Sequence, residues 1–468
     1  MKLKFRAEPK DVIIFFMFAV FLLYLVAIAI LNLHSLTVES RFWGLNPFPA
    51  FLPEYLAATL VFYLLALVGL CMTASSYFFD REKGFGYEAG KKSEDGYSKF
   101  SSAAEMKKKP DIKRITLSDD EYNYAGIPIM LNLKEAYVDD GENHSLVIGG
   151  TGSGKTQCVM LPMSRILAKA GESMIFTDPK GELYKDLGGL LKERGYNIIV
   201  LNFRDPLRGN CWNPFSLPYK FYKEGKDDKA KELIEDLASN ILADPEAAKS
   251  DPFWSDTATS YFSGLAMGLF EDAPEEYVNI NSINQMATTG EENIGRMTYL
   301  QAYFKEKGEE STAYISAAAT INAPNETKGG IVSTFKTKIR IFSSREALSE
   351  MMSKTDFDFT EIGKKKTAVF LIIQDEKKTY HSLLTIFLKQ IYESLVDVAS
   401  SQPDLKLPIR TNFMLDEFAN MPPLKDVDAM ISASRSRNMR FNFIIQNYSQ
   451  LNQQYGQDMA ETIKGNCG

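Results

Sequence analysis

Cysteine and histidine are scarce in this sequence of 468 residues. Its four cysteines, at positions 71, 158, 211 and 467, are widely separated, and no two form a Cys-x-x-Cys pair. This spacing argues against a disulfide framework and against a zinc site. With three histidines the chain has little material for a histidine-based metal centre or catalytic cluster. The formal net charge of −7 does not suggest a wholly basic nucleic-acid binder, so any polyanion must meet a local basic patch.

Two long apolar runs lie near the start of the chain. Residues 12–31 are apolar without interruption, which at 1.5 Å per residue is enough to cross a hydrocarbon core of about 30 Å. Residues 55–74 form a second run without charge. The first run is longer than a signal-peptide core and no small-residue cleavage motif follows it, so we expect two transmembrane helices. Lysines and arginines flank both outer ends, whereas Arg41 is alone between the runs, which predicts that both ends are cytoplasmic.

The pattern of apolar residues predicts four parts. Residues 1–75 form a membrane anchor, and residues 76–115, with Lys107-Lys108-Lys109, form a linker that either rests on anionic lipid or is a solvated tether. Residues 116–215 and 346–468 alternate apolar strands with helices, which is typical of a parallel sheet covered on both faces. Residues 216–345 show helical spacing, including a core stripe over 255–270, and form an all-α insertion. The expected strands are residues 145–148, 174–177, 197–201, 367–373, 412–415 and 440–445, and the expected sheet helices are residues 155–170, 181–193 and 381–399.

A glycine-rich loop follows the first strand of the sheet. It fits the pattern G-x-x-x-x-G-K-[ST] with Gly149, Gly150, Thr151, Gly152, Ser153, Gly154, Lys155 and Thr156. In such a loop the backbone N–H groups wrap a phosphate chain, while the lysine and the hydroxyl reach the terminal phosphates and Mg²⁺. A chance match in a chain of this length has a probability on the order of 1–2%. We therefore predict an α/β fold of the P-loop NTPase type, RecA-like, that binds ATP and Mg²⁺.

Two carboxylates follow a later strand. Asp416 and Glu417 come directly after the apolar residues 413–415. Opposite Lys155, Asp416 is expected to hold Mg²⁺ through water, and Glu417 to orient and deprotonate the attacking water. The alternative, a helix-capping aspartate followed by a solvated glutamate, is the less common outcome after a phosphate loop.

Arginine and glutamine side chains flank the last expected strand. Arg435 and Arg437 precede it, and Gln446 follows it. An arginine here could reach the γ-phosphate held by a neighbouring subunit, although by residue type a cationic helix end that suits the helix dipole is more common. Gln446 lies where open α/β sheets bind ligand and could sense the same phosphate.

A stretch of helix-forming sequence in the insertion carries positive charge and no acid. It is either a contact for a phosphate backbone or one solvated helix face. Its charged residues are Lys328, Lys336, Lys338, Arg340 and Arg345.

These motifs together resemble a known family, the TraG-like coupling ATPases of conjugative type IV secretion. The resemblance covers the phosphate loop, residues 178–182, 212–215, 415–418 and 434–437, Gln446 and residues 461–468, in order and approximate spacing. It implies a homo-hexamer in the cell membrane, with the ATPase domain in the cytoplasm. Such a ring passes relaxase-bound DNA, single-stranded or double-stranded, into the secretion channel components. It also implies that Lys155 and Thr156 hold phosphate and Mg²⁺, that Arg435 acts in trans, and that Gln446 is the sensor.

Other readings stay open at this point. The same motor could drive protein effectors, since such a coupling protein would share every nucleotide motif. A non-hydrolysing membrane receptor is disfavoured because it would need neither Glu417 nor Arg435. The abundance of lysine together with acidic residues resembles the composition of proteins from the mobile elements of Gram-positive bacteria. Family members continue beyond the Asn-Cys-Gly stretch with a further strand, whereas this sequence stops at Gly468, which implies a fragment or a truncation and a sheet edge without a partner.

Overall fold

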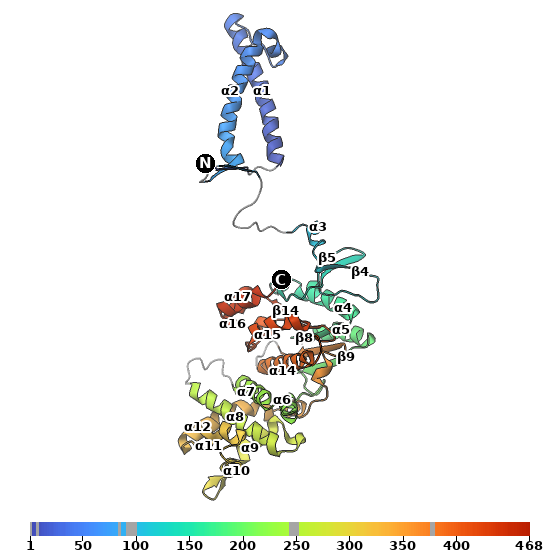
Figure 1. The fold of residues 1–468 in the computed structure, drawn as a ribbon, viewed down its shortest axis with the longest axis vertical. Helices are drawn as coiled ribbons and strands as arrows, with labels where there is room; N and C mark the ends of the chain where they lie inside the picture. Colours follow the sequence, from blue (N-terminus) through green and yellow to red (C-terminus); the bar gives the residue numbers. More distant parts are fainter. Residues whose placement is uncertain (1, 6–8, 83–85, 90–100, 243–251, 375–379) are drawn as a thin grey trace. The chain divides into compact units, whose positions relative to one another are not determined.

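The computed structural model describes residues 2–5, 9–82, 86–89, 101–242, 252–374 and 380–468. The chain divides into two compact units, Met1–Ser102 and Ala103–Gly468 (Figure 1). Part of the predicted linker, residues 83–85 and 90–100, lies outside the described residues. The two units are described separately below.

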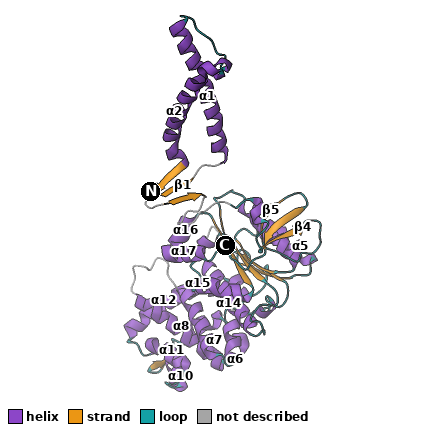
Figure 2. Ribbon diagram, turned by 45° about the horizontal axis from the view of Figure 1, so that its top comes forward, coloured by secondary structure: helices purple, strands orange, loops and turns teal. Residues whose placement is uncertain are grey.

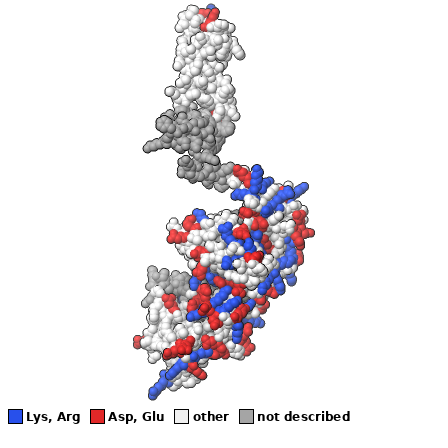
Figure 3. All heavy atoms as spheres, viewed as in Figure 1, with Lys and Arg blue, Asp and Glu red and all other residues white. Residues whose placement is uncertain are grey.

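Two long helices make up most of the first unit. Both α1 (Pro9–Val38) and α2 (Pro53–Phe78) are long and apolar enough to cross a membrane. Figure 3 shows few charged side chains along the described part of this unit, apart from its tip. The loop between the helices is closed by Asn32, whose side chain donates to the carbonyl of Gly44 (3.0 Å) and accepts from the N–H of Trp43 (3.0 Å). A short three-stranded sheet also belongs to this unit, in the order β2 (Phe79–Glu82), β1 (Lys2–Phe5), β3 (Gly86–Ala89).

A six-stranded parallel sheet forms the centre of the second unit. Its order is β7-β14-β13-β8-β12-β9, so consecutive strands cross over within the sheet. The edge strand β7 pairs with β14, and at its start a single bridge joins His144 to Cys467 near the chain end. All six expected strands are present, as β7 (Ser145–Ile148), β8 (Ser173–Asp178), β9 (Asn197–Asn202), β12 (Thr367–Ile372), β13 (Thr411–Leu415) and β14 (Met439–Ile445).

Helices cover both faces of this sheet, because side chains alternate between the faces along each pleated strand. On one face the rings of Phe176 and Phe370 stack with centroids 4.9 Å apart. On the other face those of Phe413 and Phe441 stack at 4.3 Å. The first face packs against α4 (Leu161–Ala170) and α5 (Glu182–Glu193), and the second against α14 (His381–Ser400), α15 (Val427–Ser434), α16 (Tyr448–Tyr455) and α17 (Gln457–Gly465).

The helix expected over residues 155–170 is divided in two. Thr156–Met160 form a π-helical turn in which the N–H of Leu161 donates to the carbonyl of Thr156, and the α-helix begins only at Leu161. Pro162 gives the physical reason, since it has no N–H with which to bond the carbonyl four residues earlier. The helix expected over residues 155–170 is therefore present, with a π-helical first turn.

Helices also fill the segment between β9 and β12, and Figures 1 and 2 show them gathered at the end of the unit away from β4 and β5. The predicted core stripe is buried, with Tyr261, Phe262 and Leu265 fully enclosed. A two-residue-per-strand hairpin, β10 (Asn293–Ile294) and β11 (Met297–Thr298), interrupts the helices. The helices are α6 (Ser216–Lys223), α7 (Asp227–Leu242), α8 (Pro252–Asp272), α9 (Ile280–Thr289), α10 (Tyr299–Lys307), α11 (Thr312–Ile321), α12 (Asn325–Ser343) and α13 (Glu346–Met351).

A small antiparallel sheet is fastened to the central sheet through a buried arginine. It consists of β4 (Ile112–Thr116), β6 (Glu135–Asp139) and β5 (Ile127–Leu131), in that order. The Arg440 guanidinium on β14 donates to Glu172 at 2.8 Å and to the carbonyl of Ala125 at 3.1 Å. A buried charge needs such partners, so this contact fixes the small sheet to the amino-terminal ends of the central strands.

Candidate functional site

The predicted site residues other than Arg435 meet at one edge of the central sheet, where the strands end. Four neighbouring strands, β7, β14, β13 and β8, end there, because all run parallel. The glycine-rich loop follows β7, Gln446 follows β14, Asp416 and Glu417 follow β13, and Asp178 is the last residue of β8. Ligands of open α/β sheets bind outside the carboxyl ends of the strands. The structure therefore brings together residues that are as far apart in sequence as Gly149 and Gln446.

The glycine-rich loop turns tightly around its own lysine. Gly152 (φ +77°) and Gly154 (φ +82°) have left-handed backbone conformations that other residues rarely adopt. The Lys155 ammonium donates to the carbonyl of Gly149 at 2.6 Å and to that of Gly150 at 3.3 Å. The charge is thus held directly over the loop, where it can meet a phosphate chain.

The Glu417 carboxylate is clamped by two amides. Gln446 Nε2 donates to both carboxylate oxygens, at 3.1 and 2.9 Å, and Asn420 Nδ2 donates to one of them at 2.8 Å. Gln446 Oε1 in turn accepts from the Thr151 hydroxyl at 3.3 Å, which links the glutamate to the glycine-rich loop. Glu417 itself has φ +52°, a strained conformation for a residue with a side chain, and such strain is often found at functional sites.

Asp416 is a carboxyl group in an environment that suits a cation. Burial raises the pKa of Asp416 from its usual 3.8 to about 6, and the negative charge of Glu417 adds to this rise. Lys155 opposes the rise, while Asp178 on the neighbouring strand adds to it. In the described part of the chain, no three Asp, Glu, His or Cys side chains gather as a complete metal site. Proteins commonly hold Mg²⁺ with one or two carboxylates together with the phosphates of a substrate, and Asp416 can supply one such carboxylate.

The raised pKa of Asp416 predicts a dependence of stability on pH in the nucleotide-free protein. Because the pKa of Asp416 is higher in the folded state, the folded protein tolerates the protonated carboxyl better than the charged carboxylate. The free energy of unfolding therefore falls as the pH rises through about 6 and Asp416 loses its proton. Asp416→Asn removes the penalty of the buried charge. The difference in unfolding free energy between the variant and the wild type should therefore grow from pH 4 to pH 8. The growth should reach up to about 3 kcal/mol, from a change of about two pKa units. Melting temperatures across this range, without Mg²⁺, measure the gain, and an equal difference at both pH values would contradict it.

Arg435 and Arg437 do not join this site. They form a short 3-10 turn just before β14, at the opposite edge of the sheet from Gln446. The Arg435 guanidinium donates to the Asn143 side chain at 2.8 Å, and that of Arg437 to the Ala433 carbonyl at 2.7 Å. A strand of seven residues spans roughly 20 Å at about 3.3 Å per residue. Neither arginine can therefore reach the phosphate loop of its own chain.

The basic stretch of the insertion is only partly available to a polyanion. Lys328 is buried on α12 and lies 2.6 Å from the Glu291 carboxylate. Arg345 bonds the Tyr380 hydroxyl and stacks over its ring at 5.0 Å. Lys328 is therefore removed from either interpretation of this stretch, whereas Arg345 stays exposed beside its tyrosine.

Sequence reasoning missed Asn420, which clamps Glu417. The residue lies three positions after the glutamate, in the 3-10 turn Phe418–Asn420. The sequence of this turn has no apolar periodicity from which it could be predicted. A polar amide shortly after the acidic pair was the only available signal.

Known proteins resemble this chain in sequence and in fold. The protein VirD4 of Rhizobium rhizogenes is 23% identical over 340 residues, which cover 71% of this chain and 47% of VirD4. A probable conjugal transfer protein TraG of Sinorhizobium fredii is 21% identical over 323 residues, which cover 68% of this chain and 47% of TraG. Among solved structures, the plasmid coupling protein TrwB in complex with the ATP analogue ADPNP has a TM-score of 0.51 at 16% identity, covering 78% of this chain and 76% of TrwB. TrwB in complex with ADP and Mg²⁺ gives the same TM-score at 14% identity, with the same coverage of both chains.

The likeness to TrwB confirms the predicted fold of a mostly parallel sheet with helices and a helical insertion, and the structure itself shows the two apolar helices before it. The chain spans about half the length of the curated relatives it matches. The family described as type IV secretory system conjugative DNA transfer matches residues 97–468, well over half of the chain. The chain therefore belongs to this family, as its TraG-like motifs predict.

Proposed function

We propose that this chain is a membrane-anchored ATPase that couples ATP hydrolysis to the transfer of DNA through a type IV secretion channel during conjugation. One observation carries the proposal: the phosphate loop, Asp416, Glu417 and Gln446 meet at one edge of the sheet. The family and the nucleotide complexes of TrwB support ATP and Mg²⁺ as its ligands.

The proposed chemistry assigns a role to each side chain of the site. Lys155 binds the terminal phosphates, and Thr156 and Asp416 would hold Mg²⁺, which when bound neutralises phosphate charge. Glu417 orients the attacking water and accepts its proton. Gln446 holds Glu417 and the loop at the same time, so it can sense whether a γ-phosphate lies between them.

The position of Arg435 supports a ring in which neighbouring subunits complete each site. The arginine and the phosphate loop lie at opposite edges of one sheet. A head-to-tail interface brings unlike edges of two copies together, and it forms a ring where the rotation between copies closes. Arg435 would then neutralise the γ-phosphate of the next subunit, in the hexamer that the resemblance implies.

The two apolar helices support an anchor in the cell membrane, with the second unit in the cytoplasm. Lys107, Lys108 and Lys109 are exposed just before β4 and offer a contact for anionic lipid. A relaxase bound to DNA and the components of the secretion channel are the remaining proposed partners.

Stimulation of ATP hydrolysis by DNA tests the proposal. The chain, purified in detergent, should hydrolyse ATP faster when single-stranded DNA is added at about 50 mM salt, and the stimulation should fall steeply by about 200 mM because phosphate contacts weaken with salt. Lys155→Ala should show no hydrolysis under either condition. Hydrolysis that ignores DNA but responds to an effector protein would favour the protein-transporting alternative, and no hydrolysis at all would overturn the proposed activity.

A further inference from the structure

The segment that follows Glu417 is held in an unusual way. This segment, residues 418–426, begins after Glu417 (φ +52°) and ends at Asp426 (φ +57°). Both residues have side chains and both adopt the sparsely populated left-handed conformation. Backbone of this kind persists only where the surrounding contacts fix it. The contacts of the segment therefore help to fix the backbone of Glu417, while Gln446 binds its carboxylate from outside the segment.

Three contacts fix the far half of this segment. The Lys425 ammonium lies 2.6 Å from the Asp236 carboxylate on α7, a helix of the insertion. Asp426 pairs with Lys389 of α14 at 3.2 Å, and the N–H of Leu424 donates to the Tyr455 hydroxyl at 3.0 Å. Among these, only the first joins the segment to the helical insertion.

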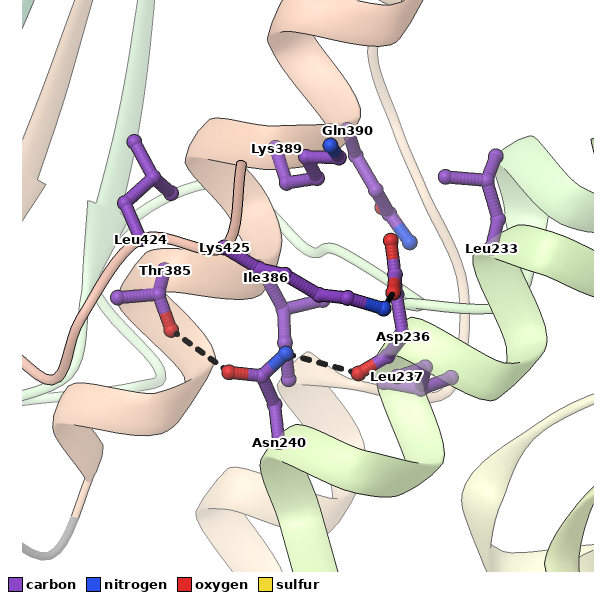
Figure 4. Close-up of a pocket in the computed structure, with 10 residues that line it drawn as sticks. All are labelled: Leu233, Asp236, Leu237, Asn240, Thr385, Ile386, Lys389, Gln390, Leu424 and Lys425. Atoms are coloured by element: carbon purple, nitrogen blue, oxygen red, sulfur yellow. Dashed lines mark hydrogen bonds and ion pairs between the residues drawn. The ribbon is translucent and has the colours of Figure 1, made fainter. Parts of the chain in front are cut away.

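Asp236 is the buried member of its ion pair with Lys425, whose side chain is 58% exposed. Figure 4 shows the Lys425 side chain reaching across from its loop to Asp236, with Leu233 and Leu237 on the same helix as the aspartate. Asp236 is 6% exposed, and the cavity beside it measures about 10 Å³, room for about one water. The enclosed carboxylate loses its charge partner when the ammonium is removed, and an unpaired buried charge is costly.

A second ion pair joins the same two parts of the chain without touching this segment. Lys226, just before α7, lies 3.2 Å from Asp397 on α14, which Lys229 also approaches at 3.7 Å; in this pair, unlike the first, the side chain that bears the carboxylate is 37% exposed. This pair serves as a matched comparison. If ion pairs merely attach the insertion to the ATPase sheet, the loss of either pair should have a similar effect.

We propose that Asp236 is a positioning residue for Glu417, acting from the helical insertion through Lys425 and the segment 418–426. The inference rests on the proposed function, since it gives Glu417 a catalytic task. In this arrangement the helical insertion influences the position of the catalytic carboxylate through Lys425 and the segment. Movement of α7 would move Lys425, and with it the segment 418–426. This would change how Asn420 and Gln446 bind the Glu417 carboxylate.

Two readouts on the full chain in detergent test the inference. Asp236→Asn and Lys425→Met should raise amide hydrogen exchange in residues 418–426 by about tenfold, since exchange reports local opening. They should also lower kcat for ATP by about tenfold with KM within about twofold, because the carboxylate acts in the transition state and not in ATP binding. The double variant should be no worse than either single one, since both remove the same contact. Lys425→Arg retains the positive charge and should keep the exchange rate and kcat near the wild-type values. Lys226→Ala should leave both quantities unchanged.

The two readouts separate the possible failures. Unchanged exchange in folded Lys425→Met, judged by an unaltered melting temperature, would overturn the inference. So would an equal loss in Lys226→Ala, which would reduce the pair to a general attachment. If the wild type hydrolyses no ATP, the proposed function fails, whereas the exchange measurement still decides whether Asp236 holds the segment.

Discussion

Replacing Glu417 by glutamine should lower kcat for ATP hydrolysis by about 10²–10⁴-fold, the usual contribution of a general base. The amide has nearly the same shape as the carboxylate but cannot accept a proton from water. Its oxygen, placed where Oε2 lies, can still accept from Gln446 and Asn420, and only the bond from Gln446 to the other oxygen is lost. The clamp should therefore survive while the chemistry is lost. Steady-state hydrolysis, together with binding of a fluorescent ATP analogue, measures the two effects separately.

Glu461→Gln is a suitable control for this change. Glu461 also bonds a neighbouring side chain, the Tyr448 hydroxyl at 3.0 Å, but it lies on α17, outside the site. This variant should keep normal turnover. Turnover by Glu417→Gln at the wild-type rate would remove the glutamate from the mechanism and would leave Asp416 as the remaining acidic candidate.

The comparison of sequence with structure separates local from distant information. The glycine-rich loop and the acidic pair were predictable because each is a short run whose residues act together, and parallel strands bring such runs to one edge. The partners of single side chains were not predictable in this way. Lys328 reads as a free charge, yet Glu291, 37 positions earlier, pairs with it inside the insertion. Asp236 and Lys425 are 189 positions apart and meet only because α7 packs beside α14.

Local patterns predict an element without its backbone details where one residue changes the backbone. The apolar spacing of residues 155–170 favours one helix, and Pro162 converts its first turn to a π-helical one. The left-handed conformation of Glu417 has no signal in sequence at all, since glycine or asparagine is usual there. The hold of the segment 418–426 on this residue became visible only in three dimensions.

Replacing Arg435 by alanine should reduce kcat by about 10³-fold or more, because an arginine supplied in trans neutralises charge that develops in phosphoryl transfer. Binding of ATP should change little, since the phosphate loop of the same chain lies at the other edge of the sheet. Arg437→Ala is the matched control. Its guanidinium is engaged with the Ala433 carbonyl, so its loss should have a much smaller effect on turnover.

Mixing two inactive variants distinguishes action in trans from a structural role. Arg435→Ala keeps an intact phosphate loop, and Lys155→Ala keeps an intact arginine, so a ring of both contains complete sites. With equal amounts and random order, about a quarter of the head-to-tail interfaces should be complete, and activity should reappear accordingly. Mixing Arg435→Ala with the double variant Lys155→Ala/Arg435→Ala forms no complete site and should stay inactive. If the first mixture is equally inactive although mixed oligomers form, Arg435 serves its own chain, and the ring proposed here loses its main support.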